Sequence, residues 1–302
     1  MIRERVLRAL ALNREPGFHF IGNLAEVSYD DVSAEATHIT FEPGPHCVDA
    51  DGQANIGVVA MLADMALAAS IRAGLHPATR LATVSMALQL TGSGLEGRLD
   101  ASGEFQGFFG AGHSRQGLAR ALIRGANGTA AIAQGAFMPL EPPPGVALFP
   151  LPRSPRTAAT LTESDLSAEE RKILARADAV LAGGEVDFLR RLLGYEPRRT
   201  KTGATCTMPN GAHAANRVGH VQGGLLMGLA ASTAAAALPS TWALSAINSF
   251  FVSPGQGKAL RARAKVIHHG LMTAVVRTEV SGPGNRRVLE TTTTHARRQV
   301  PR

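Results

Sequence analysis

Residues 216–231 read Asn216-Arg-Val-Gly-His-Val-Gln-Gly-Gly-Leu-Leu-Met-Gly-Leu-Ala-Ala231. Earlier in the chain, residues 49–64 read Asp49-Ala-Asp-Gly-Gln-Ala-Asn-Ile-Gly-Val-Val-Ala-Met-Leu-Ala-Asp64. The two stretches align without a gap at a constant offset of 167 residues. Each is a turn-rich loop followed by a long apolar run that begins near a glycine. We therefore expect two copies of one structural unit.

The two apolar runs predict buried helices. They are rich in Ala, Leu and Met, and they are too long for strands. One helix is expected from about Gly57 to Arg72 and the other from Gly224 to Leu238. Both are apolar almost all round, which is typical of a helix enclosed by other structure. At about 16 residues they fall short of the roughly 20 that cross a bilayer, and Asp64 in the first run also argues against a membrane span.

Segments with strand character surround each helix. In the first unit they cover about 36–41, 82–91, 95–105, 118–125 and 129–138. In the second they cover about 204–208, 243–252, 258–268, 272–281 and 288–296. Short turns such as Gly92-Ser-Gly94 and Pro254-Gly255 separate them, which favours antiparallel neighbours. Each unit is therefore predicted to contain a strand, a loop, a central helix and a meander of four strands.

The length of 302 residues favours two domains over one core. We expect an N-terminal domain over residues 1–141, a proline-rich linker over 142–160, and a C-terminal domain over 161–302 that begins with a helix. Ser167-Ala-Glu-Glu170 matches a capping box at the start of that helix. Its role beyond packing or forming a lid stays open.

Composition and charge narrow the class of protein. A hydrophobic content of 45% with 18% charged residues is typical of a soluble globular protein. No signal peptide is visible, so a cytoplasmic location is expected, and Cys47 and Cys206 are expected to be reduced core thiols. The net charge of +7 favours an anionic partner. Because nucleic-acid-binding motifs are lacking, we expect a small anionic ligand, with no nucleic acid and no membrane as partner. No His or Cys spacing indicates a metal site.

The second unit resembles the acyl-CoA thioesterases of the phenylacetyl-CoA and 4-hydroxybenzoyl-CoA class. Their pattern is Asn-x-x-Gly-x-x-His-Gly-Gly, with Asp or Glu nine residues after the His. Matching positions here are Asn216, Gly219, Gly223 and Gly224, while Gln222 replaces the His and Ala231 replaces the acid. In the first unit Asn55 replaces the His, Ile56-Gly57 replaces the Gly-Gly, and the acid is present as Asp64.

The resemblance implies an α+β fold of two tandem hot-dog domains, each an antiparallel sheet wrapped round a long central helix. The two domains would form an internal pseudo-dimer. The implied activity is hydrolysis of acyl-CoA thioesters, with no cofactor other than the coenzyme A of the substrate. A homodimer of such fused pairs is left open.

Thioester cleavage needs a polarised carbonyl beside a nucleophile or base. Free N–H groups at a helix start suit a developing oxyanion, and a carboxylate can attack or activate water. Asp64 lies seven residues beyond Gly57, about 10 Å along the same helix, so it needs the start of the other helix. We expect one composite site that joins Asp64 to Gly223, Gly224 and Gln222.

Further candidates surround that site. Asn216, Asn55 and Gly57 are expected to bind substrate, and Arg286 and Arg287 are candidate phosphate contacts. The second composite site would join Asn55 and Gly57 to Ala231, so it would lack a carboxylate.

Alternatives remain at this stage. Asp64 could be a buried structural aspartate, and the glycines could serve only close helix packing. The departures at Gln222, Ile56 and Ala231 favour a non-catalytic acyl-CoA binder. An enoyl-CoA hydratase or dehydratase is a third hypothesis. The sequence does not indicate the length or type of the acyl group.

Overall fold

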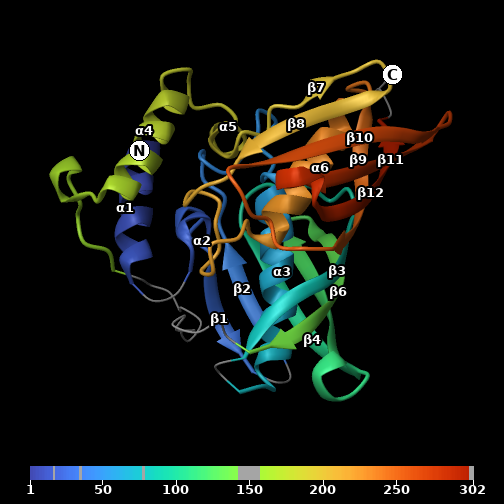
Figure 1. The fold of residues 1–302 in the computed structure, drawn as a ribbon, viewed down its shortest axis with the longest axis horizontal. Helices are drawn as coiled ribbons and strands as arrows, with labels where there is room; N and C mark the ends of the chain where they lie inside the picture. Colours follow the sequence, from blue (N-terminus) through green and yellow to red (C-terminus); the bar gives the residue numbers. More distant parts are fainter. Residues whose placement is uncertain (16–17, 34–35, 77–78, 142–156, 299–302) are drawn as a thin grey trace.

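The computed structural model describes residues 1–15, 18–33, 36–76, 79–141 and 157–298 (Figure 1). Its helices are α1 (Ile2–Arg14), α2 (Phe20–Leu24), α3 (Ile56–Arg72), α4 (Ala168–Leu181), α5 (Phe188–Leu193) and α6 (Gly223–Ala236). Its strands are β1 (Ser28–Val32), β2 (Thr37–Phe41), β3 (Arg80–Leu90), β4 (Leu99–Phe109), β5 (Gln116–Gly125), β6 (Gly128–Leu140), β7 (Arg198–Arg199), β8 (Gly203–Pro209), β9 (Trp242–Phe251), β10 (Ala259–His269), β11 (Thr273–Ser281) and β12 (Arg287–Arg297).

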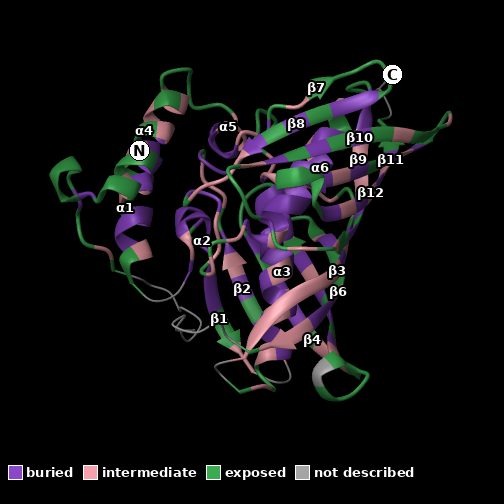
Figure 2. Ribbon diagram, viewed as in Figure 1, coloured by how far each residue is buried: buried purple, intermediate pink, exposed green. Residues whose placement is uncertain are grey.

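The helices α3 and α6 occupy the centre of the molecule, and the strands wrap round them (Figures 1 and 2). Both are buried on almost every side, as their apolar sequences predict. They run antiparallel and touch through glycine: a side chain added at Gly228 would lie 2.5 Å from the Cα of Gly57. One added at Gly224 would lie 2.2 Å from the backbone N of Met61. Only glycine lets the two helix backbones approach this closely.

The loop before each central helix has the same geometry in both repeats. The Oδ1 of Asp49 accepts hydrogen bonds from the N–H groups of Asp51 and Gln53. The Oδ1 of Asn216 accepts from Val218 and His220, at the offset of 167 that the alignment predicts. Gly52 and Gly219 have φ of 76° and 77°, a left-handed conformation that glycine adopts readily. These turns confirm the internal repeat.

All the strands form one sheet in the order β1-β2-β4-β5-β6-β3-β9-β12-β11-β10-β8-β7. The order is symmetrical about the antiparallel pair β3–β9, so each half carries the same arrangement. In that pair Ala87 faces Asn248 and Ser85 faces Phe250, while Gln89 faces Ala246. These strands therefore correspond at an offset of 161, and the first repeat has six more residues than the second between its central helix and the next strand.

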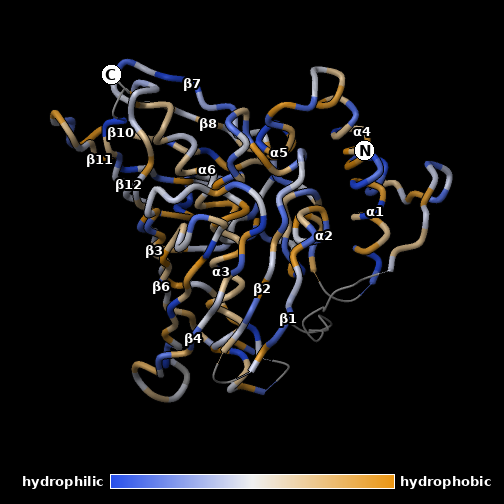
Figure 3. The backbone as a smooth tube through the Cα atoms, turned by 180° about the vertical axis from the view of Figure 1, so that it is seen from behind, coloured by the Kyte–Doolittle hydropathy of each residue, from blue (hydrophilic) through white to orange (hydrophobic). Residues whose placement is uncertain are grey.

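Strands such as β5 and β12 alternate in burial along most of their length. Hydrophobic and hydrophilic residues alternate along the strands in the same way (Figure 3). The predicted strands and central helices are confirmed with boundary shifts of a few residues. The sequence reasoning missed the short elements α2, β1 and β7. Residues 142–156 of the predicted linker lie outside the described residues, and the domain boundaries stay a prediction.

The helix that begins after Ser167 is α4, and Ser167 and Glu170 form the predicted capping box. This helix packs against α1, at a distance from the sheet (Figure 1). Arg3 pairs with Asp178, and Arg14 pairs with Glu170. Thus α4 of the second half covers the first helix of the chain, which is a packing role.

Two further sequence expectations concern the thiols and the membrane. Cys47 and Cys206 are both buried and unpaired, as expected. Within the described ranges, no helix combines the length and the apolar character that crossing a bilayer requires.

Candidate active site between the repeats

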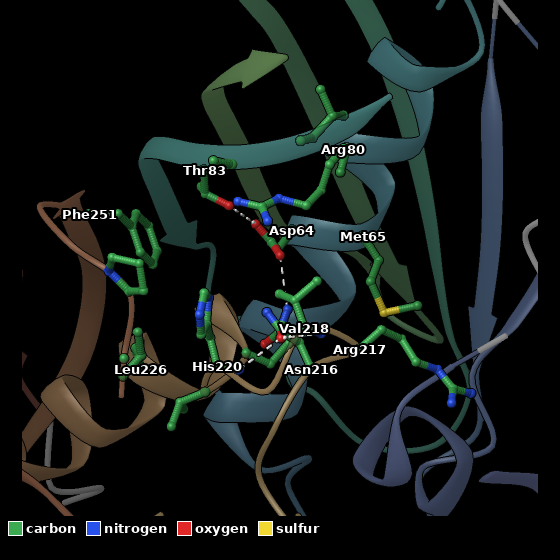
Figure 4. A pocket seen from close by; sticks show the side chains of 18 of the residues that line it. Asp64, Met65, Arg80, Thr83, Asn216, Arg217, Val218, His220, Leu226 and Phe251 are labelled. Carbon is green, nitrogen blue, oxygen red and sulfur yellow. Dashed lines mark hydrogen bonds between the residues drawn. The ribbon is translucent and has the colours of Figure 1, made fainter. Parts of the chain in front are cut away.

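A cavity of about 560 Å³ opens where the start of α6 meets the middle of α3. Both repeats line it. The first contributes residues from α3 and β3, and the second contributes the loop before α6 and the end of β9. The polar residues at its centre are Asp64, Thr83, Asn216, His220 and Gln222 (Figure 4).

The carboxylate of Asp64 is held at both oxygens (Figure 4). The Nε2 of Gln222 donates to Oδ2 at 2.9 Å, and the hydroxyl of Thr83 donates to Oδ1 at 2.9 Å. Asp64 and Thr83 belong to the first repeat and Gln222 to the second. Their hydrogen bonds therefore join the two repeats at one carboxylate.

The side chain of Gln222 is also the N-cap of α6. Its Oε1 accepts a hydrogen bond from the N–H of Leu225 at 3.1 Å, so the amide oxygen caps the helix and the amide nitrogen points to Asp64. Gln222 is 5% exposed, and these two bonds fix which end of its amide faces the carboxylate. A histidine at this position, as in the resembling thioesterases, is replaced by a group that donates without carrying charge.

Thr83 reaches Asp64 because of a β-bulge. The pairing of β3 with β6 shifts register between Thr83 and Ser85. Met86 and Leu88 face the helices, so strict alternation would turn Thr83 to the outer face of the sheet. The extra residue at Val84 reverses that phase and aims Thr83 inward, as bulges beside functional sites often do. The sequence analysis did not identify Thr83, because alternation alone assigns it to the wrong face.

Burial raises the pKa of Asp64 to about 6, and the hydrogen bond from Thr83 opposes part of that rise. A carboxyl group with this pKa is mainly ionised at neutral pH, yet it is a stronger base than an ordinary aspartate. Such a group is suited to take a proton from water near neutrality.

The cavity is rich in positive charge. Arg72, Arg80 and Arg217 line it, while Asp64 is the only acidic residue among the described residues that do so. Arg217 donates to the backbone oxygens of Asn13 and Glu15, and its side chain points away from Asp64 (Figure 4). The charge pattern suits an anionic ligand. In the described part of the chain, no cluster of three or more His, Cys, Asp or Glu side chains could hold a metal ion.

The structure brings Asp64, Gln222, Gly223 and Asn216 to this cavity. A side chain added at Gly223 would lie 3.7 Å from Oδ2 of Asp64, so the start of α6 faces the carboxylate directly. Gly224 does not line the cavity; the space where its side chain would be is filled by the backbone of α3.

The two predicted phosphate contacts differ in position. Arg286 donates to the backbone oxygen of Pro254, which lines the cavity, so Arg286 lies close to its rim. Arg287 pairs with Glu279 and Glu290. Arg287 is therefore engaged by one acidic partner on the neighbouring strand β11 and another on its own strand β12.

The two-fold equivalent of this site lies at the start of α3, and different residues occupy it. Asn55 matches Gln222 and Ala231 matches Asp64 at the offset of 167, and Leu244 matches Thr83 at the offset of 161. Asn55 caps α3 by accepting from the N–H of Gly57, and neither residue lines the cavity.

The ring of Tyr195 fills the space beside Gly57 and Gly228 in that half. The hydroxyl of Tyr195 donates to the backbone oxygen of Leu225 at 2.5 Å. The equivalent position at the start of α3, built from both halves, therefore holds a packed core in place of the polar groups around Asp64.

Solved structures of other proteins are similar to this fold, whereas the sequence comparisons give no match. A scan against protein-family models gives no match, and a search of curated proteins gives none either. Among solved structures, a provisionally assigned oleoyl thioesterase from Lactobacillus plantarum is similar, with a TM-score of 0.56 and 12% identity over 90% of this chain and 98% of that one.

Two further solved structures are similar along most of their length. A hot-dog protein of unknown function from Alicyclobacillus acidocaldarius has a TM-score of 0.54 and 9% identity, covering 91% of this chain and 96% of its own. A MaoC-like dehydratase has a TM-score of 0.52 and 11% identity, covering 82% and 84%. At such identities the likeness concerns the fold alone. The chain has the α+β tandem hot-dog fold, with a central helix and an antiparallel sheet in each half.

Proposed function

We propose that this protein hydrolyses acyl-CoA thioesters in the cavity between its two repeats. The observation that carries the proposal is the placement of Asp64 from one repeat against Gln222 and Gly223 at the helix start of the other. This arrangement supports the proposal because thioester cleavage requires a base and an oxyanion-binding group at one cavity.

In the proposed reaction, the thioester oxygen accepts a hydrogen bond from the N–H of Gly223. The first N–H groups of an α-helix have no acceptor within the helix, and the helix dipole favours negative charge there. Asp64 takes a proton from a water molecule while that water attacks the carbonyl carbon. The tetrahedral intermediate then expels the thiolate of coenzyme A, which receives the proton held by Asp64.

Gln222 and Thr83 are positioning residues in this scheme. Their hydrogen bonds hold the carboxylate at both oxygens, so its orientation does not depend on the substrate. Arg80 in the cavity and Arg286 near its rim are available to bind the phosphates of coenzyme A. One of the similar folds is a thioesterase by its provisional name, and this agrees with the proposal at the level of fold.

The test compares the wild type with Asp64→Asn on a panel of acyl-CoA thioesters, with release of the free thiol as the readout. We expect kcat/KM to fall by about 10²- to 10⁴-fold. The wild-type kcat/KM should decline below an apparent pKa of about 6, because only ionised Asp64 is a base.

A stability measurement separates lost catalysis from lost folding. The pKa of Asp64 is higher in the folded than in the unfolded state, so between about pH 4 and 6 the folded state binds more protons. The free energy of unfolding therefore falls as pH rises through that window. Asp64→Asn removes the cost of burying an ionised carboxylate, so it should raise the free energy of unfolding at pH 7 by about 1–3 kcal/mol.

The control is Asp51→Asn, because Asp51 is an exposed loop aspartate of the same repeat. It should keep wild-type activity. Tight acyl-CoA binding without turnover would instead identify a binding protein, and hydration of crotonyl-CoA would identify a hydratase.

A further inference from the structure

One arm of the cavity leads away from Asp64 along α3. Met65, Ala68, Ala69 and Arg72 line it in turn. Arg72 lies eight residues beyond Asp64, about 12 Å along the helix axis. The arm is therefore apolar beside the reacting centre and cationic at its far end.

Phe18 and Tyr29 close this arm from the side of α2 and β1. Their rings stack with centroids 5.3 Å apart, and Tyr29 is only 4% exposed. The Tyr29 hydroxyl has no hydrogen-bond partner among the described residues, and Tyr29 lines the cavity. The hydroxyl oxygen is not among the fully buried atoms that lack a partner, so it is open to the cavity, where a ligand or water can accept its hydrogen bond.

His19 adds a second donor. Its Nδ1 accepts a hydrogen bond from the N–H of Gly22 at 3.2 Å, so the proton of the neutral ring is on Nε2. Burial lowers the pKa of His19 to about 4, which keeps the ring neutral near pH 7. Because His19 lines the same cavity, its fixed role there is to donate and not to accept.

Positive charge at the far end of the arm favours an anion. Burial raises the pKa of the Tyr29 hydroxyl, and the guanidinium of Arg72 is close enough to oppose that rise. The guanidinium of Arg217 adds to the effect of burial in lowering the pKa of His19. A guanidinium keeps its charge even where burial lowers its pKa. The far end thus joins hydroxyl and imidazole donors to positive charge.

We propose that the preferred substrates are thioesters whose acyl group ends in a carboxylate, with that carboxylate bound by Tyr29, His19 and Arg72. This rests on the proposed thioesterase function. A simple alkyl chain would cover these donors without satisfying them, whereas a carboxylate accepts from all of them. The nucleotide of coenzyme A is assigned to the rim, because a 560 Å³ cavity is the size of one small ligand.

The experiment measures kcat/KM for pairs that differ only at the chain end: adipyl-CoA against hexanoyl-CoA, and suberyl-CoA against octanoyl-CoA. We expect the carboxylate-bearing member of at least one pair to be favoured by about 10- to 100-fold, the range for a hydrogen bond to a charged group. In Tyr29→Phe that ratio should fall by about 10-fold. Equal rates, or a preference for the alkyl members, would overturn the inference and leave the thioesterase proposal intact.

The matched control is Tyr195→Phe, since Tyr195 is the other of the two tyrosines and does not line the cavity. It loses a buried hydrogen bond to Leu225 but should keep the wild-type ratio. If no thioester is cleaved, the proposed function fails. The subsite is then judged by titration calorimetry, in which adipyl-CoA must bind more tightly than hexanoyl-CoA to the wild type and lose that advantage in Tyr29→Phe. Equal affinities would overturn it.

Discussion

At the scale of single residues, the site depends on how Asp64 is held. Burial raises its pKa, and the hydroxyl of Thr83 opposes the rise by donating to the ionised form. Gln222 supplies the second donor from the other repeat. A neutral amide and a hydroxyl orient the carboxylate without forming an ion pair, so no nearby cation among the described residues lowers the pKa of Asp64 from its value of about 6.

Replacing Thr83 with valine keeps the shape of the side chain and removes the donor. The ionised form of Asp64 then loses one hydrogen bond, so its pKa should rise further. We expect the acidic limb of the kcat/KM profile to move upward from pH 6 by about 0.5–1. The measurement is a pH–rate profile with the best acyl-CoA substrate.

Thr83→Ser is the matched control, because it keeps the hydroxyl. Its acidic limb in the pH profile of kcat/KM should coincide with that of the wild type. A Thr83→Val profile that coincides with the wild type would show that the Thr83 hydroxyl does not influence the ionisation of Asp64.

At the scale of elements, the two central helices and the bulge in β3 together build the cavity. The helices cross at glycines, which brings the start of α6 beside the middle of α3. The same bulge occurs in β9, where the register with β12 shifts between Leu244 and Ala246. In that repeat it presents Leu244, which packs against the core. Identical backbone geometry thus carries a polar group in one repeat and an apolar one in the other.

Two adjacent glycines at the start of α6 are expected to respond differently to alanine. In Gly224→Ala the new methyl group would lie 2.2 Å from the backbone of Met61, so the helices must separate. The free energy of unfolding should fall by about 2–4 kcal/mol. In Gly223→Ala the nearest atoms are 3.2 Å away in the ring of Phe251, and stability should stay near that of the wild type.

Urea denaturation and thioester hydrolysis measure both effects. Gly223→Ala should lose activity, since its methyl group enters the space beside Asp64. A folded and active Gly223→Ala protein would argue against a substrate carbonyl at this helix start. A Gly224→Ala protein as stable as the wild type would contradict the close helix contact.

At the scale of the whole molecule, neither half carries a complete site. Asp64 and Thr83 come from the first half, and Gln222 and Gly223 come from the second. The pairing of β3 with β9 and the contact of α3 with α6 hold the halves together. The equivalent composite position at the start of α3 has Asn55 from the first half and Ala231 and Leu244 from the second, and these supply no base. One working site per chain is therefore expected.

Separate production of fragments 1–141 and 157–302 tests this arrangement. Each fragment alone should lack thioesterase activity, and coexpression should restore it through the β3–β9 seam. Introducing Asp64→Asn into the first fragment should abolish the restored activity. Hydrolysis by either purified fragment with wild-type efficiency would show that the site is not shared between the halves.

The repeat, the two central helices and most of the strands could be predicted from the amino-acid sequence. Their signals are local: apolar runs, turn residues and alternation depend on neighbours along the chain. The glycines and Asp64 were also evident, because a carboxylate in an apolar helix and glycines at a helix start are unusual wherever they occur. The need for a composite site followed from the length of one helix.

The groups that meet at the Asp64 carboxylate depend on contacts that the local sequence does not reveal. The bulge at Val84 reverses the face of Thr83, and strand alternation cannot reveal it. Gly224 serves the helix crossing, while its neighbour Gly223 faces the cavity, a difference set by how two distant helices pack. The far arm with Tyr29 and His19 comes from short elements that have little sequence signal. Their meeting depends on contacts between residues far apart in the chain, which no local pattern encodes.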